Sequence, residues 1–347
     1  MVSGPVGLPA EPTVAVGAEP LAQVVRGGLV ESVHLGHLVV LDAAGDVVVA
    51  VGDPEAVIWP RSSLKPLQAL AMLRAGLDLP PAHLALATAS HDGTDEHLAV
   101  VREILAAAGL GTSALANTPD LPLDPAAVLA WQRAGHGPAS MTQNCSGKHA
   151  AMLTTCLAAG WPTDGYLDPT HPLQEAVRAV VADVAGPHAA RHATVDGCGA
   201  PLFSTTLTGL ARAFAHLVTA PAGSPEARVV AAMTSHPELV AGEHRDATQV
   251  MRAVPGAIAK DGADGVYAAA LPGGAALAFK VLDGASRPRP AVLAEAVRLA
   301  GALQVPGVDA GALDRLAEVP VLGGGRPVGG VQAVFGPGSW PGDEEER

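Results

Sequence analysis

Hydrophobic and polar residues alternate along residues 20–52, where β-branched residues are dense and two turn signals interrupt the pattern. The turn signals are Gly27-Gly28 and Ala44-Gly45-Asp46, which are typical of short connections between strands. Alternation with a period of two places successive side chains on opposite faces of a sheet. We therefore expect an antiparallel meander of strands at the start of the chain.

Apolar positions then recur at i, i+3 and i+4, a spacing that predicts amphipathic helices. The expected helices lie near residues 64–75, 96–109, 124–134, 147–159, 172–186, 203–217 and 224–235, and later near 290–303 and 310–317. Strand patterns return after residue 250, in AVPGAIAK, GVYAAAL and GAALAFKVLDG, and end with VGGVQAVF. This order favours an α+β, α/β-sandwich-like fold, with one antiparallel sheet built from N- and C-terminal strands and a largely helical middle.

The same pattern predicts one domain over residues 20–335, whose helical portion covers about residues 64–250. We see no internal repeat and no long linker within it. Residues 1–19 are rich in Pro, Gly and Ala, and residues 336–347 are acidic. We expect both ends to be disordered, because such segments bury too little apolar surface to offset the entropy of ordering.

Composition narrows the class of protein. Hydrophobic residues make up 49% of the chain, as in a globular protein, and the net charge of -13 argues against a basic nucleic-acid-binding surface. Three cysteines are a low and odd number, which argues against a disulfide scaffold and favours a reducing compartment. There is no signal-peptide pattern and no apolar run of about 20 residues, so we expect a soluble, cytoplasmic protein.

Lysine is rare, at four of 21 basic residues, and one of the four stands in RSSLKPLQAL. Pro66 is tolerated only in a first helical turn, so a helix begins close to Ser62. Lys65 shares a face with Ser62, and the helix dipole there disfavours a protonated amine. Lys65 could then take the proton of Ser62, as in the S-x-x-K motif of serine β-lactamases and penicillin-binding proteins. The alternative is an ordinary helix start capped by a serine.

Two further polar clusters follow in the order found in penicillin-recognising enzymes. ATASHDGTDEH carries Ser90 and His91 before a glycine turn, where a second catalytic serine could lie. AIAKDGADGVY places Lys260 at the end of a strand, as in a K-T-G motif. The alternatives are an N-cap for the helix from Asp95 and a surface lysine in a hairpin turn.

Cysteine and lysine also gather at two other predicted helix starts. NCSGKHAAML holds Cys145 and Lys148, and VDGCGAPLFS holds Asp196 and Cys198 in a glycine-rich turn. These residues could form an anion pocket or a metal site. The spacing matches no standard zinc motif, so structurally inert cysteines remain the alternative.

Together these motifs resemble a known family. RSSLKPLQ, SHDGTDEH, NCSGKHAAML, DGCGAPLFSTTL, PGAIAKDGADGVY and KVLDGASR are similar to motifs of the rhizobial-type L-asparaginases, also called the asparaginase II family. The resemblance extends from about residue 20 to about residue 335. The Cys-Ser-Gly-Lys-His and Asp-Gly-Cys-Gly motifs are quite specific to this family, and no Thr-Gly-Gly-Thr signature of the unrelated asparaginases is present.

The resemblance implies a serine-β-lactamase-like fold shared with some glutaminases, and hydrolysis of L-asparagine to L-aspartate and ammonia. It implies two Ser-Lys pairs, Ser62 with Lys65 and Ser90 with Lys260, with Ser62 as the nucleophile of an acyl-enzyme mechanism. It also implies homodimers. A glutaminase, a β-lactamase-like serine hydrolase on the same fold and a catalytically idle amino-acid-binding protein stay open as alternatives.

The resemblance further implies a metal, usually zinc, that supports substrate binding and is not essential for the chemistry. Its implied ligands are Cys145, Lys148 and Cys198. The charged groups of an amino-acid substrate also need partners, and the candidates beside the motifs are Arg61, His91 and Asp196. Arg61 could pair bidentately with a carboxylate, or could form a structural ion pair.

One stretch does not match the family pattern. AGEHRDATQVM, residues 241–251, is expected to form a loop on the substrate side. Its Arg245 and Asp246 either touch the substrate or brace the loop.

Overall fold

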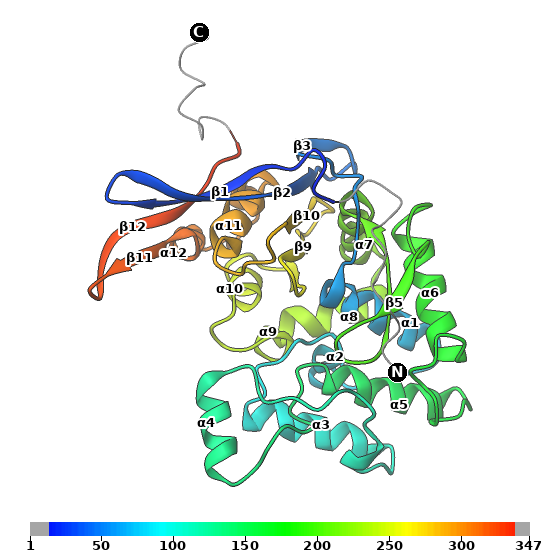
Figure 1. Ribbon diagram of the computed structural model, residues 1–347. Coiled ribbons are helices and arrows are strands. Elements are labelled where there is room, and N and C mark those ends of the chain that lie inside the picture. Colours follow the sequence, from blue (N-terminus) through cyan, green and yellow to red (C-terminus); the bar gives the residue numbers. More distant parts are fainter. Residues whose placement is uncertain (1–13, 337–347) are drawn as a thin grey trace, which may run out of the picture.

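The computed structural model describes residues 14–336 and shows an antiparallel sheet with helices packed on it and beside it (Figure 1). The predicted α+β class is confirmed. The predicted disordered ends fall mainly on residues 1–13 and 337–347, which lie outside the described residues. Among the residues that are described, no helix is both long enough and apolar enough to cross a bilayer.

The main sheet joins the two ends of the chain. Its strands lie in the order β11-β12-β1-β2-β10-β9-β8, and β3 also pairs with β2. The bounds are β1 (Glu19–Arg26), β2 (Leu29–Leu41), β3 (Val47–Val51), β8 (Ile258–Asp261), β9 (Val266–Ala270), β10 (Ala276–Val281), β11 (Val319–Gly323) and β12 (Arg326–Ala333). Ala22 of β1 lies opposite Ala333 of β12, and all named pairings in this sheet are antiparallel. The predicted meander and the predicted sheet built from both ends are therefore confirmed.

Helices fill the middle of the chain as the apolar spacing predicts. They are α1 (Lys65–Arg74), α2 (Pro81–Ala87), α3 (Asp95–Ala107), α4 (Pro125–Arg133), α5 (Ser146–Ala158), α6 (Pro172–Val184), α7 (Leu207–Thr219), α8 (Pro225–Ser235), α9 (Pro237–Val240), α10 (Asp246–Ala253), α11 (Arg289–Leu299) and α12 (Ala310–Ala317). Short 3₁₀ segments are η1 (Arg61–Leu64), η2 (Thr112–Ala114) and η3 (Ala302–Gln304). Two small strand pairs complete the described chain: β4 (Val57–Ile58) with β7 (Thr205–Thr206), and β5 (Ala193–Val195) with β6 (Pro201–Phe203).

The sheet is covered unevenly. Every residue of β8 and β9 is buried, so both faces are covered at that end of the sheet. Helix α7 packs on β9, β10 and β2, and α11 packs on β1 and β12. The outer strands β1, β2, β12 and β11 extend away from the main helical body (Figure 1).

Helix α1 brings its first residue into the interior. Its residues from Lys65 to Leu73 are all buried, because α1 packs among α5, α6 and α8. The segment η1, which precedes it, lies against the end of β8. A Cβ at Gly262 would come within 2.6 Å of the Pro60 carbonyl oxygen, so glycine permits this close approach. The S-x-x-K segment and the K-x-G segment therefore meet at one place.

Candidate active site

Ser62 lies in η1, just after a strained residue. Arg61 has a φ of 53°, a left-handed conformation that is uncommon for a residue other than glycine. Such outliers gather at functional sites. Ser62 is half-buried, and its carbonyl accepts the Lys65 N–H. Within residues 14–336 its hydroxyl makes no hydrogen bond, so it is free to meet a ligand.

Ser90 lies between two lysine side chains. Its Oγ is 3.0 Å from Nζ of Lys65 and 2.9 Å from Nζ of Lys260. All three side chains are buried, and Ser90 is only 4% exposed. They come from the start of α1, the loop after α2 and the strand β8. The structure thus brings Lys65, Ser90 and Lys260 together, with both lysines bonded to the same serine rather than one to each.

Lys260 is held by the residue that follows it. Its Nζ donates to the Asp261 carboxylate at 2.6 Å and to the Asp261 carbonyl at 2.7 Å. Burial lowers the pKa of Lys260 to about 8; the negative charge of Asp261 opposes this shift, and the charge of Lys65 adds to it. A neutral Lys260 amine is therefore accessible close to neutral pH.

Two arginines hold Asp261 in turn. Arg245 donates to its Oδ2 at 2.7 Å and to Oδ1 of Asp92 at 2.9 Å. Arg289 lies 3.6 Å from the same Oδ2 and also binds Asp246. Burial alone would raise the pKa of Asp261, but Lys260 and the two arginines hold it well below its usual range. Asp261 is therefore a fixed negative charge behind Lys260.

Sequence reasoning missed this support. Asp261, Asp92 and Arg289 were not among the predicted site residues. The expected loop at residues 241–251 ends in a helix, because α10 begins at Asp246. Arg245 braces the Asp261 side of the site.

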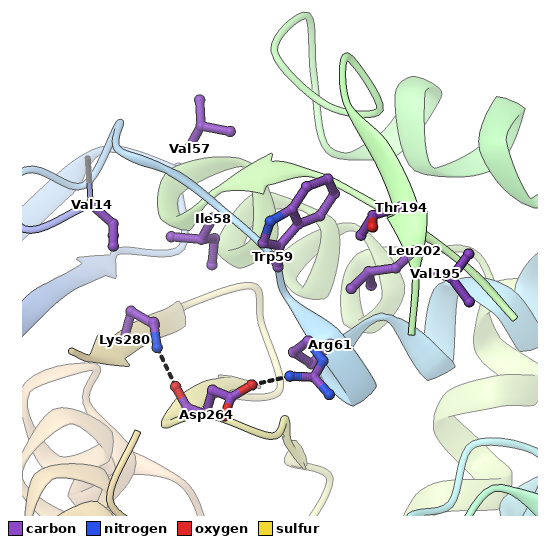
Figure 2. Close-up of a pocket in the computed structure, with 10 residues that line it drawn as sticks. All are labelled: Val14, Val57, Ile58, Trp59, Arg61, Thr194, Val195, Leu202, Asp264 and Lys280. Carbon is purple, nitrogen blue, oxygen red and sulfur yellow. Dashed lines mark hydrogen bonds and ion pairs between the residues drawn. The ribbon is translucent and has the colours of Figure 1, made fainter. Parts of the chain in front are cut away.

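The predicted substrate-binding residues fall in two places. Arg61 Nε donates to Asp196 at 2.8 Å, and its NH1 also pairs with Asp264. His91 is buried, and its Nε2 lies 2.8 Å from the Ser146 hydroxyl. Burial, with the charges of His97 and Lys65, lowers the pKa of His91 well below its usual range, so its imidazole is neutral. Arg61 lines a pocket of about 640 Å³, shown in Figure 2, and His91 is not among its lining residues.

Cys145, Lys148 and Cys198 form a second buried cluster. Lys148 Nζ donates to Cys198 Sγ at 3.3 Å, and the Cys145 thiol donates to Asn144 Oδ1 at 3.0 Å. Both cysteines are free. Burial lowers the pKa of Lys148, but the negative charges of Cys198, Cys145 and Asp196 outweigh it, so the net shift is upward.

The chain matches one family model over residues 22–333, the model described as L-asparaginase II. This chain belongs to the L-asparaginase II family. The family resemblance predicted from the motifs is confirmed, and the protein is an amidohydrolase.

Solved structures similar to this L-asparaginase II family member include one described as a β-lactamase from Mycobacterium bovis. That structure is 17% identical with a TM-score of 0.40, over 81% of this chain and 95% of the other. A putative β-lactamase from Bacteroides dorei is 14% identical with a TM-score of 0.40, over 71% and 85% of the two chains. Mglu in its native form is 16% identical with a TM-score of 0.34, over 78% and 65%. None of the curated proteins is similar enough in sequence to match.

The cysteine cluster supplies two sulfur donors for the metal that the family resemblance implies, Cys145 and Cys198. Thiolate sulfur and a neutral nitrogen are donors that suit zinc. Residues 14–336 contain no group of three His, Cys, Asp or Glu side chains that could hold a metal ion, so the Lys148 amine has to serve as the third donor. It points at the Cys198 sulfur already, and would have to lose its proton to bind a metal.

Proposed function

We propose that this amidohydrolase cleaves L-asparagine to L-aspartate and ammonia, with Ser62 as the nucleophile. The observation that carries the proposal is the Ser90 hydroxyl held between two buried lysine amines, behind the helix start that presents Ser62. Ser90 is buried and its hydroxyl is engaged by both lysines. Ser62 is half-buried with a free hydroxyl among the described residues, which favours it as the atom that meets the substrate.

The reaction begins when Ser62 Oγ attacks the side-chain amide carbon of asparagine and its proton passes to Nζ of Lys65. The carbon–nitrogen bond then breaks, and the proton moves from Lys65 to the departing nitrogen, which leaves as ammonia. Ser90 links Lys65 to Lys260, so a proton can pass between the two amines through one hydroxyl. Water then attacks the acyl ester and gives a proton through Ser90 to Lys260. As the bond from the acyl carbon to Ser62 Oγ breaks, a proton returns through Ser90 and Lys65 to Ser62, which frees L-aspartate and restores the enzyme.

The developing oxyanion needs hydrogen-bond donors. The N–H groups of Ser62 and Ala263 have no acceptor among residues 14–336, whereas the Gly262 N–H donates to the Val266 carbonyl. A Cβ on Gly262 would lie 3.4 Å from the Ser63 amide nitrogen, so the two segments are adjacent. We assign the Ser62 and Ala263 N–H groups to the oxyanion.

Binding of the amino acid uses charge. Arg61 pairs with the α-carboxylate and Asp196 with the α-ammonium group, while neutral His91 acts through its bond to Ser146. Zinc, when bound by Cys145, Lys148 and Cys198, would supply positive charge that helps to hold the substrate.

The test is ammonia release from L-asparagine and L-glutamine by the purified protein and its Ser62→Ala variant. We expect release from asparagine, with a loss of at least about 10³-fold in the variant because nucleophilic attack is removed. Mass spectrometry should also find the acyl group on Ser62. Ser63→Ala is the matched control, since the Ser63 hydroxyl donates to the Pro60 carbonyl and takes no part in the reaction.

Three results would redirect the proposal. Activity that survives in Ser62→Ala but not in Ser90→Ala would move the nucleophile to Ser90. Preference for glutamine or a β-lactam would change the substrate. Tight binding of asparagine without release of ammonia would make the protein a binding protein.

A further inference from the structure

The guanidinium of Arg61 is already paired with two carboxylates. Its Nε donates to Asp196 Oδ1 at 2.8 Å, and its NH1 donates to the Asp264 carboxylate. The two acids differ in exposure, since the side chain of Asp196 is 13% exposed and that of Asp264 is 63% exposed. One partner is thus part of the interior, and the other stands in solvent.

Asp196 is built into its position. Its Oδ1 also accepts the Gly197 N–H at 2.8 Å. These two hydrogen bonds fix the carboxylate on the Nε side of Arg61.

Asp264 is held only by its backbone and by Arg61. It lies in the tight turn between β8 and β9, where Asp264 and Gly265 both have positive φ. Its carbonyl accepts a hydrogen bond from Lys280, which anchors the turn. Among the described residues, its carboxylate has no hydrogen-bond donor other than Arg61. Rotation of one side chain would therefore release the arginine without moving the turn.

The contact lies in the wall of the 640 Å³ pocket. Figure 2 shows Asp264 between Lys280 and Arg61, below Trp59 and Ile58. An arginine presents a planar fork of N–H groups that fits a carboxylate with two parallel bonds. Asp196 occupies the Nε side of the Arg61 guanidinium, so an incoming carboxylate can bind only at the NH1 end. The Asp264 carboxylate already pairs with that end.

We propose that Asp264 is a specificity-determining gate that occupies, in the free enzyme, the position on Arg61 taken by the α-carboxylate of the substrate. This inference rests on the proposed function, in which Arg61 binds that carboxylate. The gate keeps Arg61 paired when no substrate is present. A ligand must carry a carboxylate to displace it. The apparent Kd of such a ligand is its intrinsic Kd divided by the fraction of enzyme in which Arg61 is free of Asp264.

The test measures binding without turnover. L-Aspartate, the product, is titrated calorimetrically into the native protein and into Asp264→Asn, since asparagine fits a positive-φ turn and removes the charge. We expect aspartate to bind roughly 2- to 10-fold more tightly to Asp264→Asn, as for removal of a partly exposed competing ion pair. The KM for asparagine should fall by a similar factor. Asp196→Asn is the matched variant, and it should weaken binding.

The direction of the change decides the outcome. Weaker binding in Asp264→Asn would mean that Asp264 positions Arg61 instead of competing for it, and unchanged binding would mean that it does not occupy the carboxylate position; either result overturns the gate. Arg61→Met separates this failure from that of the proposed function. If aspartate binding is lost in Arg61→Met but unchanged in Asp264→Asn, only the gate falls. If Arg61→Met binds aspartate as well as the native protein does, both fall.

Discussion

Lys260 and Lys148 are buried to the same extent, at 0% and 1% exposed, yet their proton affinities are shifted in opposite directions. Burial lowers the pKa of each lysine, because the charged form loses its water. At Lys260 burial prevails, and the pKa falls to about 8. At Lys148 the charges of Cys198, Cys145 and Asp196 prevail, and the pKa rises.

The neighbours of the two amines explain the difference. Lys260 has one acid, Asp261, but that acid is shared with Arg245 and Arg289, and Lys65 adds positive charge. Lys148 faces three such groups, Cys198, Cys145 and Asp196, of which Asp196 is also paired with Arg61. The first lysine is suited to accept and return protons, and the second to hold negative groups together. Burial alone therefore does not tell a catalytic lysine from a binding one.

The strongest test of this comparison is Lys260→Arg against Lys148→Arg. Arginine keeps the charge but cannot lose its proton in a protein. We expect Lys260→Arg to lower kcat by roughly 10²- to 10⁴-fold, the usual contribution of a positioned acid or base. Lys148→Arg should lower it by about tenfold at most, because Lys148 takes no part in the proposed proton transfers.

Thermal unfolding of both variants is the control for this pair, since arginine is larger and each site is buried. The values of kcat are compared only if each variant unfolds cooperatively at a temperature close to that of the native protein. Equal losses of kcat in the two folded variants would contradict the division between a proton-transfer lysine and a binding lysine.

A smaller effect should appear in the pH dependence. Only neutral Lys260 can accept a proton, so kcat/KM should fall about tenfold per pH unit below an acid limb near pH 8. The charge of Asp261 raises the pKa of Lys260, so Asp261→Asn should move this limb to lower pH. The other charged groups facing Lys260, Lys65 and Arg245, lower its pKa and are unchanged in the variant.

Asp261→Asn should also lose stability, by roughly 3 kcal/mol, because it leaves the buried cations without their acid. Urea unfolding measures this loss. An acid limb that stays in place in Asp261→Asn would show that the titrating group is not Lys260. Asp283→Asn is the matched control, since Asp283 pairs with His34 on another part of the sheet, and its acid limb should not move.

The sequence predicted most of the helices and the strands at both ends of the chain, and it missed the short helices α2, α9 and α10. The strands at both ends and the long amphipathic helices follow the expected positions. Helix α2, PAHLALA, was not predicted because its sequence is almost wholly apolar and therefore shows no polar face. Helix α10 was not predicted because it follows a polar stretch that resembles a loop.

The candidate site divides in the same way. The scarcity of lysine singled out Lys65 and Lys260, but it did not indicate which serine side chain each lysine would contact. That contact depends on where the loop carrying Ser90 lies after folding, which no spacing along the chain reports. Strand alternation also places Asp261 on the face opposite Lys260, so a bond between them is not expected from sequence. The bond forms because β8 ends at Asp261 and the chain turns there.

The smallest expected effect concerns the cluster around Lys148. Cys198→Ala should abolish binding of zinc by the purified protein, measured by elemental analysis after dialysis. It should raise the KM for asparagine only a few-fold, because a charge that helps to hold the substrate is typically worth about 1 kcal/mol. Cys156→Ala is the control, because Cys156 is buried in α5 but packs in the main core, apart from the cluster that holds Cys145 and Cys198. Zinc retained by Cys198→Ala would leave the two thiols as partners of the Lys148 ammonium group alone. The difference between the two lysines would then rest on charge, with no part played by a metal.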